Sequence, residues 1–216
     1  MTHTLRFPLS PLRMAVLLSG RGTTLENLLR RIEAGELDAQ VVHVHSSRVD
    51  ARGLELAHSR GISTSVCRRR DYPSLEAFSQ AVFAQVEPAR PHLIVMAGYV
   101  KLLRIPPQWE HRVMNVHPSL IPAFCGRGYY GLRVHQAVLE YGCKITGCTV
   151  HFVDNQYDHG PIILQQPVPV QEGDTPELLA ARVQAAEREL YPRAIALFAA
   201  GRLHVEGRWV RIDQEA

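Results

Sequence analysis

Asn115 and His117 are two residues apart in a short apolar segment, residues 113–117, that has the character of a buried strand. Alternate residues of extended backbone share a face, so the two side chains are expected to point the same way. An amide that donates a hydrogen bond beside an imidazole can stabilise a developing oxyanion and move a proton. The alternative is a structural histidine beside a strand-end asparagine, in a chain that has 11 histidines.

Asp158 is the third candidate for this chemistry, and it stands just before Gly160 and Pro161 in a turn-like segment. A carboxylate delivered by such a loop could stabilise a protonated imidazole at His117. An aspartate in this position also commonly forms an Asx turn with its own backbone. The residues alone leave both interpretations open.

A glycine-bearing turn, Ser19–Thr24, joins the first apolar segment to an amphipathic one. Free N–H groups at the start of a helix attract anions, and the Thr23 and Thr24 hydroxyls would add donors. The segment matches neither the nucleotide P-loop nor the dinucleotide-binding fingerprint. It therefore predicts an anion site, with a plain strand-to-helix turn as the alternative.

The elements that would position these residues alternate along the first half of the chain. Apolar runs predict strands at 14–19, 40–45, 64–67, 93–96 and 113–117, and amphipathic segments predict helices at 25–34, 51–60 and 75–86. Further on, the pattern predicts a helix at 132–141, β-rich runs at 144–153 and 162–170, a long helix from about 176 to 200 and a short strand at 209–212. This order predicts an α/β fold with a Rossmann-like, mostly parallel sheet, helices on both faces, and antiparallel strands towards the C-terminus.

Composition indicates an ordinary globular protein of one domain over residues 1–216. The chain is 46% hydrophobic and 21% charged, and its 24 basic and 21 acidic side chains give a net charge of +3. The apolar stretch around 93–100 is too short to span a bilayer, and no secretory signal precedes Met14, so we expect a cytoplasmic protein without a membrane partner.

Three further patterns exclude other classes of site. The four cysteines form no C-x-x-C pair, which favours reduced thiols. His43 and His45 have no carboxylate at ligand spacing, so no metal is assigned. The basic run at 68–70 lacks interleaved aromatic residues, so no nucleic-acid partner is expected.

Taken together, the motifs resemble those of the folate-dependent phosphoribosylglycinamide formyltransferases of purine biosynthesis. The resemblance runs from about Met14 to Leu203 through AVLLSGRGTTLENLL, SSRVDARGLELA, LIVMAGYVKLL, NVHPSLIPAF, GCTVHFVDNQYDHGPIILQQPVPV and ARVQAAERELYP. It implies transfer of the formyl group of 10-formyltetrahydrofolate to the amine of phosphoribosylglycinamide, giving the N-formyl product and tetrahydrofolate. Asn115 and His117 would stabilise the oxyanion, and Asp158 would support His117 and help to move the proton.

The resemblance also assigns binding residues and partners. The ribonucleotide would be held by Gly22, Thr23, Thr24, Asn115 and Glu187. The folate co-substrate would meet Val100, Lys101, Leu102 and Leu103, together with Asp154 and Asp158 of the folate-facing loop. No metal is implied, and the partners are these small molecules. A homodimer is one candidate assembly, and the sequence leaves the oligomeric state open.

The chain departs from the family pattern at several places. Thr23-Thr24 replaces the usual Ser-Asn, Leu75 stands where a folate-contacting arginine is common, and Arg70 is a candidate substitute. A glycine-rich loop, Cys125–Gly131, replaces a shorter stretch, while His135 keeps a family histidine, and residues 1–13 lie outside the resemblance.

Two other functions are compatible with the same core. A hydrolase of 10-formyltetrahydrofolate would use water in place of the amine, but it would need no phosphate loop. A non-catalytic folate or nucleotide binder would not need Asn115, His117 and Asp158 together.

Overall fold

The computed structural model describes residues 7–213, so the first six residues of the predicted N-terminal extension lie outside the described part. The chain forms two compact units, residues 7–114 with 199–201 and residues 115–198 with 202–213. Each unit is described below by itself. The prediction of a single domain over 1–216 stays a prediction.

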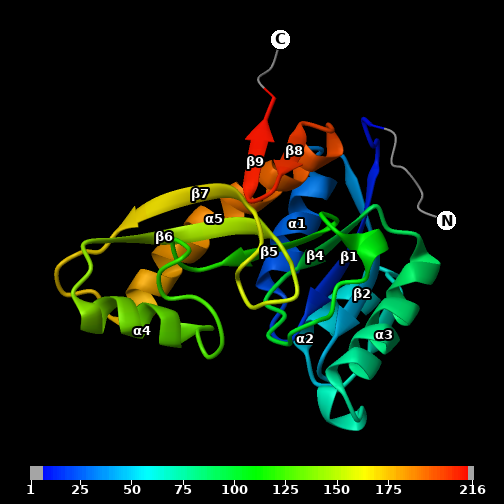
Figure 1. The fold of residues 1–216 in the computed structure, drawn as a ribbon, viewed down its shortest axis with the longest axis horizontal. Helices are drawn as coiled ribbons and strands as arrows, with labels where there is room; N and C mark the ends of the chain where they lie inside the picture. Colours follow the sequence, from blue (N-terminus) through cyan, green and yellow to red (C-terminus); the bar gives the residue numbers. More distant parts are fainter. Residues whose placement is uncertain (1–6, 214–216) are drawn as a thin grey trace. The chain divides into compact units, whose positions relative to one another are not determined.

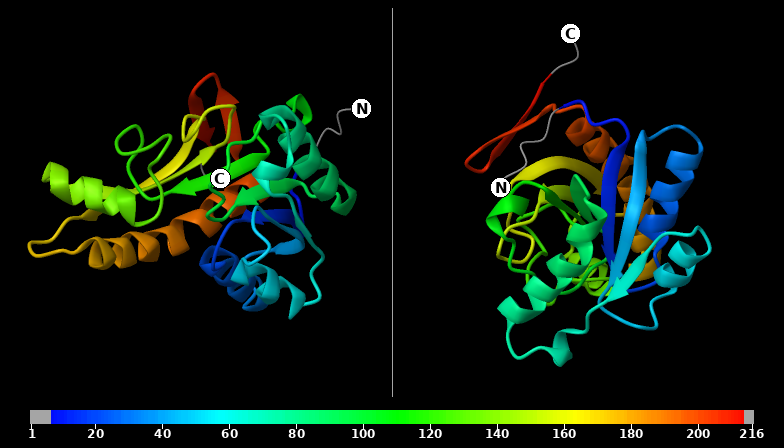
Figure 2. Two further views of the ribbon diagram at one scale, coloured as in Figure 1. Left: turned by 90° about the horizontal axis from the view of Figure 1, so that it is seen from below. Right: turned by 90° about the vertical axis from the view of Figure 1, so that its right-hand side faces the viewer.

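The first unit contains a parallel sheet with the strand order β3-β2-β1-β4 (Figure 1). Its elements are β1 (Leu12–Leu18), α1 (Thr23–Glu33), β2 (Ala39–Ser46), α2 (Arg52–His58), β3 (Thr64–Val66), α3 (Leu75–Val86) and β4 (Leu93–Met96). Helices α1 and α2 lie on one side of this sheet and α3 on the other (Figure 2). Coverage on both faces explains the continuous apolar strands, because neither face meets water.

Strand β1 begins two residues before the predicted start. Leu12 is fully buried and pairs with Ala39 of β2. Arg13 is accommodated next to it because its guanidinium donates to the carbonyl oxygens of Ala89 (2.6 Å) and Arg90 (3.2 Å). Because the charged Arg13 interrupts the apolar run, the hydrophobic pattern placed the start of this strand two residues too late.

The second unit is built around an antiparallel pair, β6 (Ile145–Phe152) and β7 (Ile162–Pro169). Strand β9 (Trp209–Ile212) is parallel to β7 and forms a hairpin with β8 (Leu203–Glu206). Helix α4 (Leu132–Tyr141) precedes β6, and α5 (Pro176–Ala199) runs along one face of the β6–β7 pair (Figures 1 and 2). Strand β5 (Val113–His117) is divided between the two units.

The fold class predicted from the sequence is confirmed: a mostly parallel sheet with helices, extended by antiparallel strands. Strand β8 was not predicted, since its four residues alternate half-buried and exposed and it is held by pairing with β9. Among residues 7–213, no helix combines the length and the apolar character that spanning a bilayer requires.

Candidate active site

His117, at the end of β5, is 4% exposed and lies between a carbonyl and a carboxylate. Its Nε2 is 2.9 Å from the carbonyl oxygen of Phe124, and its Nδ1 is 3.5 Å from Oδ2 of Asp158. A carbonyl oxygen can only accept, so Nε2 carries a hydrogen. The Nδ1 atom therefore faces the carboxylate, and a proton gained there would lie between the imidazole and Asp158.

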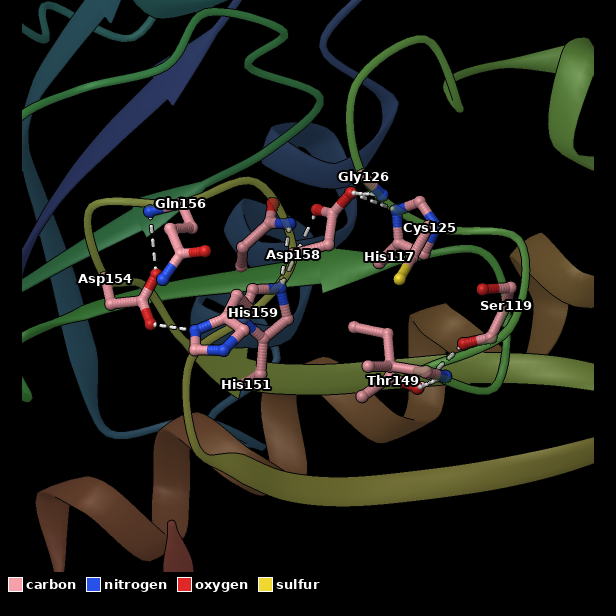
Figure 3. A network of polar contacts seen from close by, with 12 residues as sticks. His117, Ser119, Cys125, Gly126, Thr149, His151, Asp154, Gln156, Asp158 and His159 are labelled. Atoms are coloured by element: carbon pink, nitrogen blue, oxygen red, sulfur yellow. Dashed lines mark hydrogen bonds and ion pairs between the residues drawn. The ribbon is translucent and has the colours of Figure 1, made fainter. Parts of the chain in front are cut away.

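Asp158 comes from the loop between β6 and β7, where its backbone has the left-handed φ of 50°. Its Oδ2 accepts the backbone N–H of Gly126 at 2.8 Å, and its Oδ1 is 3.9 Å from Nε2 of His151 (Figure 3). The Asx turn of this loop is formed by Asp154, whose Oδ1 accepts the N–H of Gln156 at 2.8 Å. Asp158 thus has its carboxylate directed at His117.

His151 is a site residue that the sequence did not single out. This side chain of β6 is 1% exposed; its Nδ1 donates to the carbonyl oxygen of Phe152 at 2.7 Å. Burial lowers the pKa of His151, so the ring is neutral and its Nε2 accepts from Nδ2 of Asn115 at 3.2 Å. This bond fixes the Asn115 amide and leaves its second Nδ2 hydrogen for another acceptor, such as an oxyanion.

The segment that carries the Phe124 carbonyl is anchored by Ser119 and Thr149. Ser119 Oγ donates to the carbonyl oxygen of Ala123 at 2.6 Å, and Thr149 Oγ1 donates to the carbonyl oxygen of Ser119 at 2.7 Å. Thr149 Oγ1 also accepts the N–H of Ile121 at 3.1 Å. These bonds hold the backbone that faces His117 (Figure 3).

The Cys125–Gly131 loop contributes a backbone donor to this cluster. Gly126 has a φ of 92°, which L side chains rarely adopt, and its N–H is the one that meets Asp158. Burial, and secondarily the nearby Asp158, raise the pKa of the Cys125 thiol. One glycine of the Cys125–Gly131 loop therefore has a structural explanation, because the backbone conformation of Gly126 lets its N–H donate a hydrogen bond to the Asp158 carboxylate.

His135, on α4, is 2% exposed in the same unit. Burial, and secondarily the charge of His117, lower the pKa of His135 to about 4. His135 therefore stays neutral at physiological pH.

In the first unit, the glycine-bearing turn meets the start of α2. Gly22 has a φ of 80°, and a Cβ there would lie 2.7 Å from the Cα of Gly53, so the position requires glycine. Thr23 and Thr24 begin α1, whose first N–H groups have no partner within the helix. Thr23 is exposed and Thr24 half-buried, so both are accessible to an anion at this terminus.

The Val100–Leu103 segment follows β4 in the same unit. Val100 is 41% exposed, and its N–H donates to Ser19 Oγ at 3.2 Å. Leu103 is 1% exposed and packs in the core, so within this segment Val100 is the apolar side chain most open to a ligand.

Leu75, the first residue of α3, follows the helix cap Ser74. Arg70, the candidate substitute for an arginine at position 75, has an exposed side chain, with its Nε 4.0 Å from Asp71. Its exposure leaves the guanidinium able to meet an acidic ligand.

Glu187 lies on α5, in the second unit. Burial, and secondarily the charge of Glu187, raise the pKa of the Cys148 thiol of β6. Burial of the Glu187 carboxyl raises its pKa to about 7, against the opposing effect of Arg188. A carboxyl that titrates near neutrality can carry either a proton or a charge when a cationic or neutral amine approaches.

The raised pKa of Glu187 predicts a pH-dependent stability. The folded chain binds this proton more tightly than the unfolded chain, so stability falls as pH rises from about 4.5 towards 7. We expect Glu187→Gln to raise Tm on the order of 5 °C at pH 8 and to change it little at pH 5. Thermal unfolding at both pH values measures this, with the exposed Glu172→Gln as the control. An equal shift at both pH values would contradict the assignment.

Among the described residues, no group of three or more histidine, cysteine, aspartate or glutamate side chains could hold a metal ion. All four cysteines are free thiols. The described clusters therefore consist of hydrogen-bonding and titrating groups.

The chain matches the family model described as formyl transferase over residues 12–195. It is 39% identical to a phosphoribosylglycinamide formyltransferase of Mycobacterium tuberculosis over 96% of this chain and 95% of that protein. The corresponding Escherichia coli protein is 35% identical over 92% of this chain and 93% of its own length. The chain belongs to the formyltransferase family.

Solved structures give the same result. The glycinamide ribonucleotide transformylase 1 of Symbiobacterium toebii has a TM-score of 0.86 and 42% identity, covering 98% of both chains.

The trifunctional purine biosynthetic protein adenosine-3 of Gallus gallus is 40% identical over 89% of this chain. The chain spans 19% of that protein's length and about a fifth or less of the similar trifunctional proteins.

Proposed function

We propose that this chain is a transferase that moves the formyl group of 10-formyltetrahydrofolate to the amine of phosphoribosylglycinamide in purine biosynthesis. The observation that carries the proposal is the cluster of Asn115, His117 and Asp158, with His117 Nδ1 3.5 Å from the carboxylate. The names of full-length relatives at 35–39% identity support the same reaction.

The proposed reaction begins with attack of the glycinamide nitrogen on the formyl carbon. A C–N bond forms and the carbonyl electron pair moves to oxygen, giving a tetrahedral oxyanion that the Asn115 amide and a protonated His117 stabilise. Asp158 stabilises that charged imidazole. The proton leaving the attacking amine is passed to N10 of the folate, whose bond to the formyl carbon breaks as the carbonyl re-forms. Both products then carry the correct number of protons.

We assign the binding residues as the family resemblance implies. Gly22, Thr23 and Thr24 bind the phosphate of the ribonucleotide, and Glu187 and Asn115 bind elsewhere on it. The folate is bound by Val100–Leu103, Asp154 and Asp158. Within the first of these segments Val100 contacts it through an exposed side chain, whereas the buried Leu103 supports the segment from the core. A cytoplasmic location, the absence of a metal, nucleic-acid or membrane partner, and a homodimer remain expectations of this proposal.

The phosphate role of the glycine turn makes a separate prediction. We expect Thr23→Ala combined with Thr24→Ala to weaken ribonucleotide binding by roughly 100-fold, because each hydroxyl supplies a hydrogen bond to a charged group worth about 1.5 kcal/mol. Binding of the folate is expected to be unchanged. Calorimetric titration with each ligand separately measures both effects. Equal loss of both ligands would show that the turn has only a structural role.

The reaction itself is tested by a spectroscopic assay of formyl transfer from 10-formyltetrahydrofolate with and without phosphoribosylglycinamide. Deformylated folate that forms only with the ribonucleotide supports the proposal. Product that forms equally without it identifies a hydrolase. Folate that binds without any product in either case identifies a non-catalytic binder.

A further inference from the structure

A chain of polar side chains enters the core of the first unit from its surface, away from Asn115, His117 and Asp158 in the sequence. His43 and His45 lie on the same face of β2 and are 6% and 0% exposed. Ser63, which is exposed, and Ser65 of β3 stand beside them. Burial lowers the pKa of both histidines, that of His45 to about 3, so both rings are neutral.

The direction of each hydrogen bond in this chain follows from counting hydrogens. Ser63 Oγ is 3.1 Å from the carbonyl oxygen of Val42 and 2.8 Å from Nδ1 of His43. The carbonyl can only accept, so Ser63 donates to it and accepts from His43 Nδ1–H. In a neutral ring Nε2 of His43 is then an acceptor, and it receives the hydrogen of Ser65 at 2.7 Å.

Counting hydrogens in the same way determines the tautomer of His45. Ser65 has used its hydrogen on His43, so its Oγ accepts from His45 Nδ1–H at 2.8 Å. Nε2 of His45 is consequently an acceptor. It is buried and has no hydrogen-bond partner within residues 7–213.

Tyr99 supplies the complementary group. Its ring centroid is 6.1 Å from that of His45, its side chain is 7% exposed, and its buried hydroxyl has no hydrogen-bond partner among the described residues. Burial raises the pKa of Tyr99, so the hydroxyl keeps its hydrogen as a donor. A buried acceptor and a buried donor thus lie on neighbouring rings, and leaving either of them without a hydrogen bond would destabilise the folded chain.

We propose that His45 Nε2 and the Tyr99 hydroxyl together bind one small neutral ligand that both donates and accepts hydrogen bonds, a single water molecule. The water donates to Nε2 and accepts from the hydroxyl, as buried waters do between otherwise unpaired polar groups. The bridge joins β2 to the residue that precedes Val100. If Val100–Leu103 meets the folate, a point that rests on the proposed function, the bridge also steadies the start of that segment.

Tyr99→Phe tests the bridge, because it removes one oxygen and keeps the ring. We expect Tm to fall by roughly 2–4 °C, since the substitution takes one hydrogen bond from the water and from no other described group. In a His45→Phe background the same change is expected to cost less. Tyr141→Phe, at an 81% exposed tyrosine, is the matched control and should leave Tm unchanged.

Two results would overturn the proposal, and neither depends on enzyme activity. A Tm that is unchanged or raised in Tyr99→Phe would show that the hydroxyl has no bound partner. An equal loss in the His45 and His45→Phe backgrounds would show that its partner is not shared with His45. Long-range ¹H–¹⁵N spectra add a direct check, in which His45 is expected as the Nδ1–H tautomer and an Nε2–H tautomer would contradict the hydrogen count.

Discussion

His117→Ala is expected to lower the rate of formyl transfer roughly 10²- to 10⁴-fold while the chain stays folded. The imidazole lies between the Phe124 carbonyl and Asp158. In the proposed mechanism it carries the proton and stabilises the oxyanion, and alanine can do neither. Substrate affinity is expected to change much less than turnover, because the charge develops only in the transition state. Steady-state kinetics with both substrates measures the two effects separately.

His204 provides the matched control for this variant. It also pairs with an aspartate, since its Nε2 is 2.7 Å from Oδ2 of Asp213, but both side chains are exposed. His204→Ala should leave turnover unchanged. Near-normal turnover in His117→Ala would remove the imidazole from the mechanism.

Asp158→Asn is expected to lower turnover by about 10²-fold or more, because in the proposed mechanism it removes the charge that stabilises protonated His117. The replacement has nearly the same shape, and its amide oxygen can still accept the N–H of Gly126. We therefore expect a small change in Tm beside a large change in rate. Thermal unfolding and kinetics on the same preparation make the comparison.

The matched variant for Asp158→Asn is Asp213→Asn, in the exposed pair with His204. It is expected to keep full activity. If Asp158→Asn loses stability and activity together, the carboxylate has a structural role in the loop. If it keeps activity, the charge on Asp158 is not needed for transfer.

The sequence predicted the Asn115–His117 pair through strand periodicity, and it left the role of Asp158 open between an Asx turn and a charge partner. In the structure Asp154 forms the Asx turn and Asp158 faces His117. Nothing in the local sequence separates these two aspartates, because both stand in one turn-like segment. The choice depends on where the segment 124–126 places its backbone, 32 residues away along the chain.

His151 is a second residue whose part in the site could not be predicted from the local sequence. As one histidine in an apolar strand, it is typical of a core residue, and its burial agrees with that interpretation. Its part in the site follows from the pairing of its Nε2 with the amide of Asn115, 36 residues earlier. A hydrogen bond between distant positions leaves no periodic pattern that could predict it.

By itself the sequence determined most of the secondary-structure elements, though not β8, and the fold class, because hydrophobic periodicity and helix caps act over a few residues. Helix α3 and strands β4 and β5 begin and end where the pattern predicts, and Gly22 is the glycine that its turn requires. Only the tertiary structure decided which polar groups meet: Asp158 with Gly126, Asn115 with His151, and His45 beside Tyr99. These contacts join residues 32–54 positions apart, and their partners are set by how strands and loops pack, which local patterns do not encode.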